Sequence, residues 1–126
     1  EDFVIATGRM ETVRNFIEIS AKYLKWNKGK DDPAIIWEGK GVNEVGRRAD
    51  NNKIVVRVDK RYFRPSEVDQ LLGDASKARI KLGWVSNTPL EELIKEMIYN
   101  DLIEAKQENL NEKQIKKCRQ KLGDFI

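Results

Sequence analysis

The sequence predicts a small mixed α/β domain with several amphipathic helices and short strands. Ile54, Val56 and Val58 alternate with Val55, Arg57 and Asp59, which is the period-2 pattern of a half-buried strand. Elsewhere apolar residues recur at three- and four-residue spacing, as in helices with one buried face. A chain of 126 residues that is 40% apolar has the length of one domain and can form a modest core.

The N-terminal part predicts a strand followed by a helix. Phe3–Thr7 is an apolar run typical of a short buried strand, and Gly8 marks the turn after it. Thr12 is a suitable N-cap for the helix that follows. The apolar stripe of this helix consists of Val13, Phe16, Ile17, Ala21 and Leu24.

Ala34–Glu38 is the next predicted strand, and Gly39–Lys53 is expected to form an irregular excursion between two strands. The glycines of the excursion raise the alternative of a phosphate-binding loop. However, no Gly-x-Gly-x-x-Gly pattern opens a helix after a strand, and no Walker-type motif occurs. The plain β-excursion is therefore favoured, and the chain shows no signature of dinucleotide binding.

After the predicted strand Ile54–Val58, the sequence predicts a short helix that begins at Pro65. Pro65 suits the first position of a helix, because its φ is fixed and it lacks a backbone donor. Gly73 suits the left-handed residue that would end this helix. The apolar face of the predicted helix contains Val68, Leu71 and Leu72.

Arg64 and Glu67 would lie at the N-terminus of that helix. Free backbone N–H groups and an arginine fork both favour an anion there, and the fork matches the geometry of phosphate oxygens. The alternative is that Arg64 and Glu67 pair with each other on a solvated surface. Tyr62 and Phe63 are interpreted as core or wall residues.

Two further helices are predicted towards the C-terminus. Asp74 can cap a short helix that Gly83 ends, and Trp84 after it is expected to fill the core. Thr88–Glu91 has the form of a capping box that opens a long helix. Its apolar stripe contains Leu90, Leu93, Ile94, Met97, Ile98 and Leu102. The charged tail from Asn109 onward is expected to form a further helix, docked or frayed.

Composition excludes several kinds of site. The chain has no histidine and a single cysteine, Cys118, so it cannot contain an intrachain disulfide, a zinc site of His and Cys, or a Ser-His-Asp or Cys-His catalytic group. The lone cysteine fits a reducing cytoplasm. No apolar run has the length of a membrane span. Because the first residue is Glu1 and not Met, a fragment or a processed product is considered.

The net charge of 24 − 21 = +3 is mildly basic, with both signs mixed along the chain. Basic residues gather near the C-terminus, where they form either a solvated helix face or a surface for nucleic acid or an acidic partner. This second option makes a small basic interaction module the alternative function. The residues concerned are Lys113, Lys116, Lys117, Arg119 and Lys121.

An ordered set of short motifs resembles the C-terminal part of the GDP-mannose 4,6-dehydratase family, within the extended short-chain dehydrogenases/reductases. Arg61–Pro65, with the sequence Arg-Tyr-Phe-Arg-Pro, is the most specific of these motifs. The set spans residues 2 to about 106 and also includes Asp2–Gly8, Val13–Arg14, Trp37–Gly41, Glu44–Gly46, Val58–Val68, Leu71–Asp74, Lys77–Ala78 and Lys81–Trp84.

The resemblance implies a substrate-binding domain at residues 1–107 and a charged tail or helix at 108–126. It implies that an N-terminal Rossmann domain, absent from this chain, binds NADP and carries the catalytic Ser/Thr, Tyr and Lys. The family converts GDP-mannose to GDP-4-dehydro-6-deoxy-mannose and water. This chain alone should therefore be inactive and bind no cofactor or metal. The expected partners are GDP-mannose, the Rossmann half and further copies of the enzyme in the cytoplasm, without nucleic acid or membrane.

The resemblance also assigns site residues. Arg64 is similar to the family arginine that contacts the GDP pyrophosphate, and Glu67 is similar to a glutamate that faces the nucleotide. Arg61 is the third candidate. No catalytic, cofactor-binding or metal-binding residue is assigned in this chain. Three departures occur: Lys60 stands where the family usually has proline, Thr12 stands where serine is common, and Gly46–Lys53 is a variable excursion.

Overall fold

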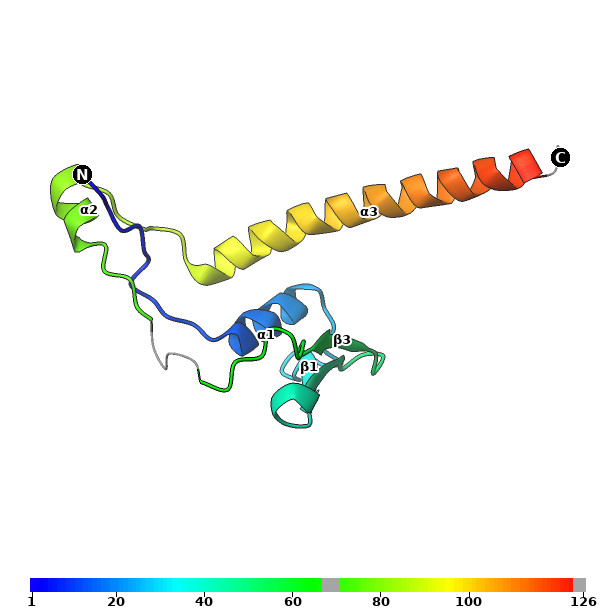
Figure 1. Cartoon of the computed structure of the whole chain (residues 1–126), viewed down its shortest axis with the longest axis horizontal. Coiled ribbons are helices and arrows are strands. Elements are labelled where there is room, and N and C mark those ends of the chain that lie inside the picture. The colour runs from blue at the N-terminus through cyan, green and yellow to red at the C-terminus, as the bar shows by residue number, and fades with distance from the viewer. Residues whose placement is uncertain (67–70, 124–126) are drawn as a thin grey trace.

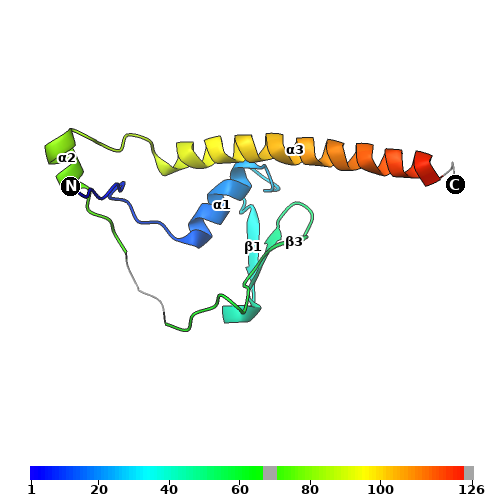
Figure 2. The ribbon, with the colours of Figure 1, turned by 45° about the horizontal axis from the view of Figure 1, so that its top comes forward.

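The computed structural model describes residues 1–66 and 71–123, and in its last turns it leaves the side chains of residues 118 and 121–123 undescribed. Figures 1 and 2 show a sheet and a short helix beneath one very long helix, with a second short helix near the N-terminus. The predicted mixed α/β class is confirmed. In order, the elements are α1 (Val13–Tyr23), β1 (Ile35–Glu38), the 3₁₀ turn η1 (Gly41–Asn43), β2 (Val45–Arg48), β3 (Ile54–Arg57), α2 (Ser76–Leu82) and α3 (Leu90–Gly123).

The three strands form an antiparallel sheet in the order β1-β2-β3. Ile35 of β1 lies opposite Arg48 of β2, and Val45 of β2 lies opposite Arg57 of β3. β1 and β3 were predicted, and Ile54 and Val56 of β3 are half-buried as their alternation indicated. The segment between them was predicted to be an irregular excursion, and this prediction is wrong, because the segment contains the strand β2. Its sequence Val-Gly-Arg-Arg lacks an apolar alternation, so only its pairing on both sides makes it a strand.

Gly46 of β2 lies where the sheet has no room for a side chain. A Cβ placed on it would be 3.0 Å from Trp37 Cζ3, 3.1 Å from Val56 Cβ and 3.2 Å from Ile35 Cγ2. The glycine therefore serves packing in the sheet, in agreement with the rejection of a phosphate loop. Gly39 has a φ of +84°, and its Cβ would be only 2.6 Å from the Asn43 carbonyl oxygen, so it belongs to the tight turn before η1.

The main core joins α1 to β1. Ala21 of α1, Ala34 and Ile35 are almost fully buried together. Ile17, Trp26 and Trp37 pack around them. The predicted N-cap of α1 is confirmed, because the Thr12 hydroxyl accepts a hydrogen bond of 3.1 Å from the Asn15 backbone N–H.

Two local predictions are wrong. Phe3–Thr7 forms no strand in this chain, since a strand needs a partner and no other segment in the part of the chain described here pairs with it. No helix begins at Pro65 either, because Pro65 and Ser66 form a bend and 71–73 is irregular. The middle of that predicted helix, including Val68, lies outside the described residues. Gly73 does not adopt the left-handed conformation expected of a helix end.

α2 agrees with the sequence. Gly83 ends it with a φ of +66°, in the left-handed region, and Asp74 accepts hydrogen bonds from the backbone and hydroxyl of Ser76. Ala78 is completely buried. Trp84 is only half-buried, so it is a wall of a hollow rather than the core residue that we expected.

α3 is a single helix that continues through the predicted tail. Its 34 residues give a length of about 51 Å at 1.5 Å per residue. Ile94 is completely buried, where the first turns of α3 pack on α1. From Tyr99 on, every side chain that the structure describes in α3 is exposed. As far as residue 123, the tail is therefore a continuation of α3 and not a separate helix. In the described residues, no helix combines the length and apolarity that crossing a membrane requires.

The crowding at Gly46 predicts a specific loss of stability. Gly46→Ala should lower the free energy of unfolding by about 1 to 3 kcal/mol, because the added methyl group forces Trp37, Val56 or Ile35 to move. Urea unfolding followed by circular dichroism measures this change. Gly29→Ala is the control, since its methyl group meets only the carboxylate end of the Asp32 side chain. Equal stability of the two variants would contradict the packing role of Gly46.

Candidate functional site

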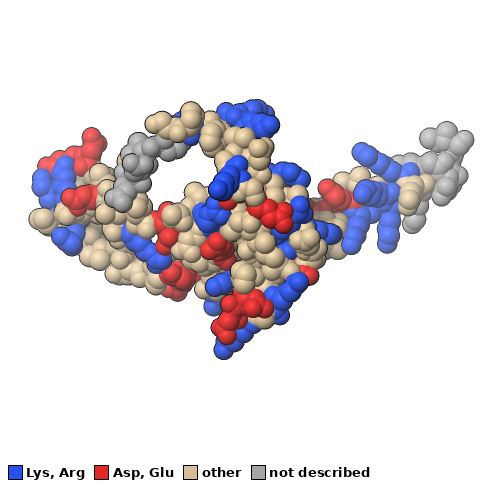
Figure 3. Space-filling view, turned by 90° about the horizontal axis from the view of Figure 1, so that it is seen from below, with Lys and Arg blue, Asp and Glu red and all other residues tan. Residues whose placement is uncertain are grey.

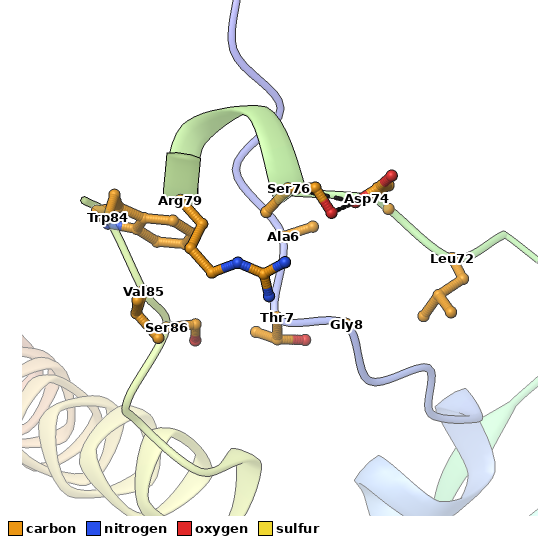
Figure 4. Close-up of a pocket in the computed structure, with 12 residues that line it drawn as sticks. Ala6, Thr7, Gly8, Leu72, Asp74, Ser76, Arg79, Trp84, Val85 and Ser86 are labelled. Atoms are coloured by element: carbon orange, nitrogen blue, oxygen red, sulfur yellow. Dashed lines mark hydrogen bonds between the residues drawn. The ribbon is translucent and has the colours of Figure 1, made fainter. Parts of the chain in front are cut away.

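Two open hollows lie between the N-terminal segment and the chain around α2. The first encloses about 320 Å³ and is lined by the segments 6–8, 72–76 and 84–86 together with Arg79. Figure 4 shows the Arg79 side chain reaching from α2 across this hollow towards Thr7. Trp84 forms an apolar wall beside it. The hollow thus combines guanidinium, hydroxyl and carboxylate groups with one aromatic surface.

Asp74 is held at the rim of the first hollow. Its carboxylate accepts 2.9 Å from the Ser76 backbone N–H and also accepts from the Ser76 hydroxyl. These bonds lower the pKa of Asp74, with a smaller contribution from the charge of Arg79. A carboxylate that stays charged at neutral pH keeps this rim acidic, opposite the guanidinium of Arg79.

The second hollow, of about 280 Å³, lies next to the first and shares Thr7 and Ser86 with it. Arg9, which lines this hollow, makes a bidentate ion pair: its Nη1 and Nη2 donate to the two carboxylate oxygens of Glu91 at 3.2 and 3.1 Å. Arg9 also donates to Glu11 at 2.9 Å. This network ties the N-terminal segment to the first turn of α3.

Hydrogen bonding within this network shifts the ionisation of its members. The bond from Arg9 lowers the pKa of Glu91. The pKa of Glu11 is lowered first by its bond with Asn15 and then by Arg9. The pKa of Arg9 is raised in return. All of these groups are accessible to solvent, so the network orients the segment more than it stabilises the fold.

Of the three site residues that the sequence suggested, the structure describes Arg61 and Arg64. Arg64 is exposed in an irregular segment after β3, without the helix N-terminus that supported an anion site there. Arg61 is engaged by Asp59, to which its Nη2 donates at 2.7 Å, and this pairing lowers the pKa of Asp59 and raises that of Arg61. Glu67 lies outside the described residues. Of the two described arginines, Arg61 therefore has a carboxylate partner among the described residues, and Arg64 is exposed.

A second cluster was not anticipated from the sequence. The guanidinium of Arg14 lies 4.3 Å from the centre of the Trp37 ring and pairs with Glu44. Trp37 Nε1 donates 2.9 Å to Glu18 on α1. The same arrangement recurs where Arg48 covers Trp26 at 4.3 Å. These contacts fix α1 against the sheet, and no local spacing could have indicated them, because the partners are 19 to 30 residues apart.

The surface seen in Figure 3 carries basic and acidic side chains intermixed over its main body, in keeping with the mixed charge pattern of the sequence. In the described part of the chain, no three residues of the His, Cys, Asp and Glu types are placed to hold a metal ion. Gly39 and Gly46 have backbone or side chains packed against them.

The fold and the two hollows define the class of protein: it is a small mixed α/β domain with open hollows that polar groups and an aromatic side chain line. The chain belongs to the GDP-mannose 4,6 dehydratase family, because the model of that family matches residues 1–97. The match covers α1, the sheet, α2 and the start of α3, and it ends before the exposed part of α3.

Curated relatives bear the same name. The chain is 49% identical over 102 residues to the "GDP-mannose 4,6 dehydratase" of Cricetulus griseus and 47% identical over 102 residues to that of Homo sapiens, covering 81% of this chain and 26% of each relative. It is 46% identical over 120 residues to the "GDP-mannose 4,6-dehydratase" of Yersinia enterocolitica, covering 87% of this chain and 30% of the relative. The chain thus spans about a quarter to a third of the length of these relatives.

The Arg9 network predicts a measurable change in ionisation. In Arg9→Gln, the pKa of Glu91 should rise towards its ordinary value of 4.5, because the bond that favours the carboxylate is lost. The contribution of this pair to stability is present above pH 4.5 and is lost as the pH falls through the lowered pKa of the folded state. A carbon-detected NMR titration of Glu91 measures the shift.

Arg48→Gln is the matched control for that titration. It removes an arginine that is bound to Asp50 in the sheet part of the chain, away from the second hollow. The pKa of Glu91 should remain lowered in this control. A Glu91 pKa that is the same in Arg9→Gln and in the parent chain would mean that the bidentate pair does not persist in solution.

Proposed function

We propose that this chain is the GDP-sugar-binding portion of a longer GDP-mannose 4,6-dehydratase. The whole enzyme would convert GDP-mannose to GDP-4-dehydro-6-deoxy-mannose and water, as an NADP-dependent lyase of the cytoplasm that assembles from several copies. The match of the family model to residues 1–97 is the observation that carries this proposal. The names of the relatives support the same substrate.

Within the proposed site, Arg64 contacts the pyrophosphate of the GDP moiety. Its guanidinium is exposed, and a planar fork can donate two parallel hydrogen bonds to phosphate oxygens. Arg61 has a lesser role, because Asp59 already occupies its donors. Glu67 completes the site as an acceptor for the nucleoside.

NADP binding and the chemical step belong, on this proposal, to a Rossmann half that this chain lacks. The packed surroundings of Gly39 and Gly46 support the assignment of the cofactor elsewhere. A nucleotide sugar in a cleft between two domains loses the contacts of one wall when one domain is missing. The isolated chain is accordingly inactive and binds GDP-mannose weakly.

The alternative of a basic nucleic-acid module has less support. Lys113, Lys116 and Lys117 do lie on the exposed part of α3. However, Glu108 and Glu112 precede them on the same helix, so the sign of the charge is not uniform. Such a module would bind with affinity that falls steeply with salt and that does not depend on Arg64.

A chimeric enzyme tests the proposal. The matched 102 residues of the Homo sapiens relative are replaced by the corresponding residues of this chain, and turnover of GDP-mannose is measured. We expect activity in the chimera and none in the isolated chain. Arg64→Ala in the chimera should lower kcat/KM by about 10- to 100-fold, because a hydrogen bond to a charged group contributes about 1.5 to 3 kcal/mol.

Arg57→Ala in the chimera is the matched control. Arg57 is an exposed arginine at the end of β3, so it removes the same charge without removing the proposed contact. Activity that survives Arg64→Ala at the level of this control would show the assignment of Arg64 to be wrong. A folded chimera without activity would instead contradict the proposed function of the domain.

A further inference from the structure

We propose that one face of the exposed part of α3 binds an acidic, amphipathic peptide segment of another protein. We call this face the lysine stripe. The inference does not depend on the proposed function, because the stripe lies wholly after residue 97, where the match of the family model ends. The lysine stripe consists of Tyr99, Ile103, Lys106, Leu110, Lys113 and Lys117.

The members of the lysine stripe lie on one side of the helix. Their positions follow each other in alternating steps of four and three residues, which keeps them within about 80° of one another around a helix of 3.6 residues per turn. All of these side chains are exposed, with exposed fractions of 67% for Tyr99, 40% for Ile103 and 59% for Leu110. Figures 1 and 2 show the last turns of α3 extending beyond α1 and the sheet. The stripe thus presents apolar and cationic side chains together to solvent.

The acidic residues of the same part of α3 lie on the opposite side. Successive steps of three, four and four residues separate them, and they are turned by about half a circumference from the lysine stripe. At its own positions the stripe therefore carries lysines and no carboxylate, although both signs alternate along the sequence. These acidic residues are Asp101, Glu104, Glu108 and Glu112.

This separation by face places like charges next to each other. Lys113 and Lys117 are four residues apart, and such a like-charge pair destabilises a helix. Glu108 and Glu112 repeat the arrangement on the opposite side. Packing does not compensate, because every described side chain from Tyr99 on is exposed. A partner with carboxylates opposite the stripe would remove the repulsion between the lysines and bury the apolar side chains, so charge complementarity selects an acidic partner.

Three other occupants fit the lysine stripe less well. In a two-fold symmetric pair of copies the stripe would meet itself, and lysine would face lysine. A nucleic-acid backbone would pair with the lysines but leave Ile103 and Leu110 in water. At a membrane surface, lysines belong on the polar side of a helix, whereas Lys106 lies between Ile103 and Leu110. An acidic amphipathic helix offers both carboxylates and apolar contacts along the stripe.

Fluorescence anisotropy with a labelled synthetic peptide tests the proposal on the full chain. The peptide is a helix of about 21 residues with Leu and Glu at alternating three- and four-residue steps and with Ala and Gln elsewhere. We expect saturable binding that weakens at least about tenfold when Lys113→Glu and Lys117→Glu are combined, because attraction becomes repulsion. Lys113→Gln combined with Lys117→Gln adds no new charge to the helix and should weaken binding in the same direction. Leu110→Asn should also weaken it.

Lys28→Glu combined with Lys30→Glu is the matched control. Both are exposed lysines in the loop between α1 and β1, so the net charge changes by the same amount away from α3. This control should bind the peptide within about twofold of the parent chain, because separated surface charges are screened by salt. Equal weakening in the two charge reversals, or no saturable binding by the parent chain, would overturn the proposal. Tighter binding of a DNA oligonucleotide or of phosphatidylserine vesicles at the same lysines would overturn it as well, and so would self-association through the stripe.

Discussion

The contact between α1 and β1 is the interaction on which the other elements depend. Ala21 and Ala34 are small enough to let the helix approach the sheet closely, and Ile35 fills the space between them. β2 and β3 are then added to β1 by backbone pairing, and the first turns of α3 pack on the other side of α1. Since few side chains are fully buried, the loss of packing at this contact would leave little apolar stabilisation elsewhere.

Local sequence patterns were sufficient where the structure is locally determined. Thr12 caps α1 and Gly83 ends α2, because capping and left-handed conformations depend on the residue itself. The pattern of β3 was readable since one of its faces is half-buried. β2 was missed because its pairing with both neighbours, and not its composition, makes it a strand. The strand expected at Phe3–Thr7 failed for the converse reason, since its composition is suitable but no other segment among the described residues pairs with it.

The candidate site shows the same division between local and distant information. Arg64 and Arg61 could be named from the sequence because they form part of one short motif. The pairing of Arg61 with Asp59 required the structure, since it decides which arginine has its donors engaged. The bidentate pair of Arg9 and Glu91 joins residues 82 positions apart and has no signature in either segment. The helix that would have given Arg64 an anion-binding terminus does not begin at Pro65, so the motif itself carries the assignment.

The three tryptophans are intrinsic fluorescent probes, and they are distributed over both parts of the molecule. Trp26 and Trp37 lie beneath the guanidinium groups of Arg48 and Arg14, in the part built on α1 and the sheet. Trp84 lies in the wall of the hollow beside α2. Because a nearby cation and solvent exposure both alter indole emission, the fluorescence of a variant that retains only Trp84 would report on the part of the chain around α2. The order in which the two parts unfold on heating could then be followed by the emission of their tryptophans, without any attached dye.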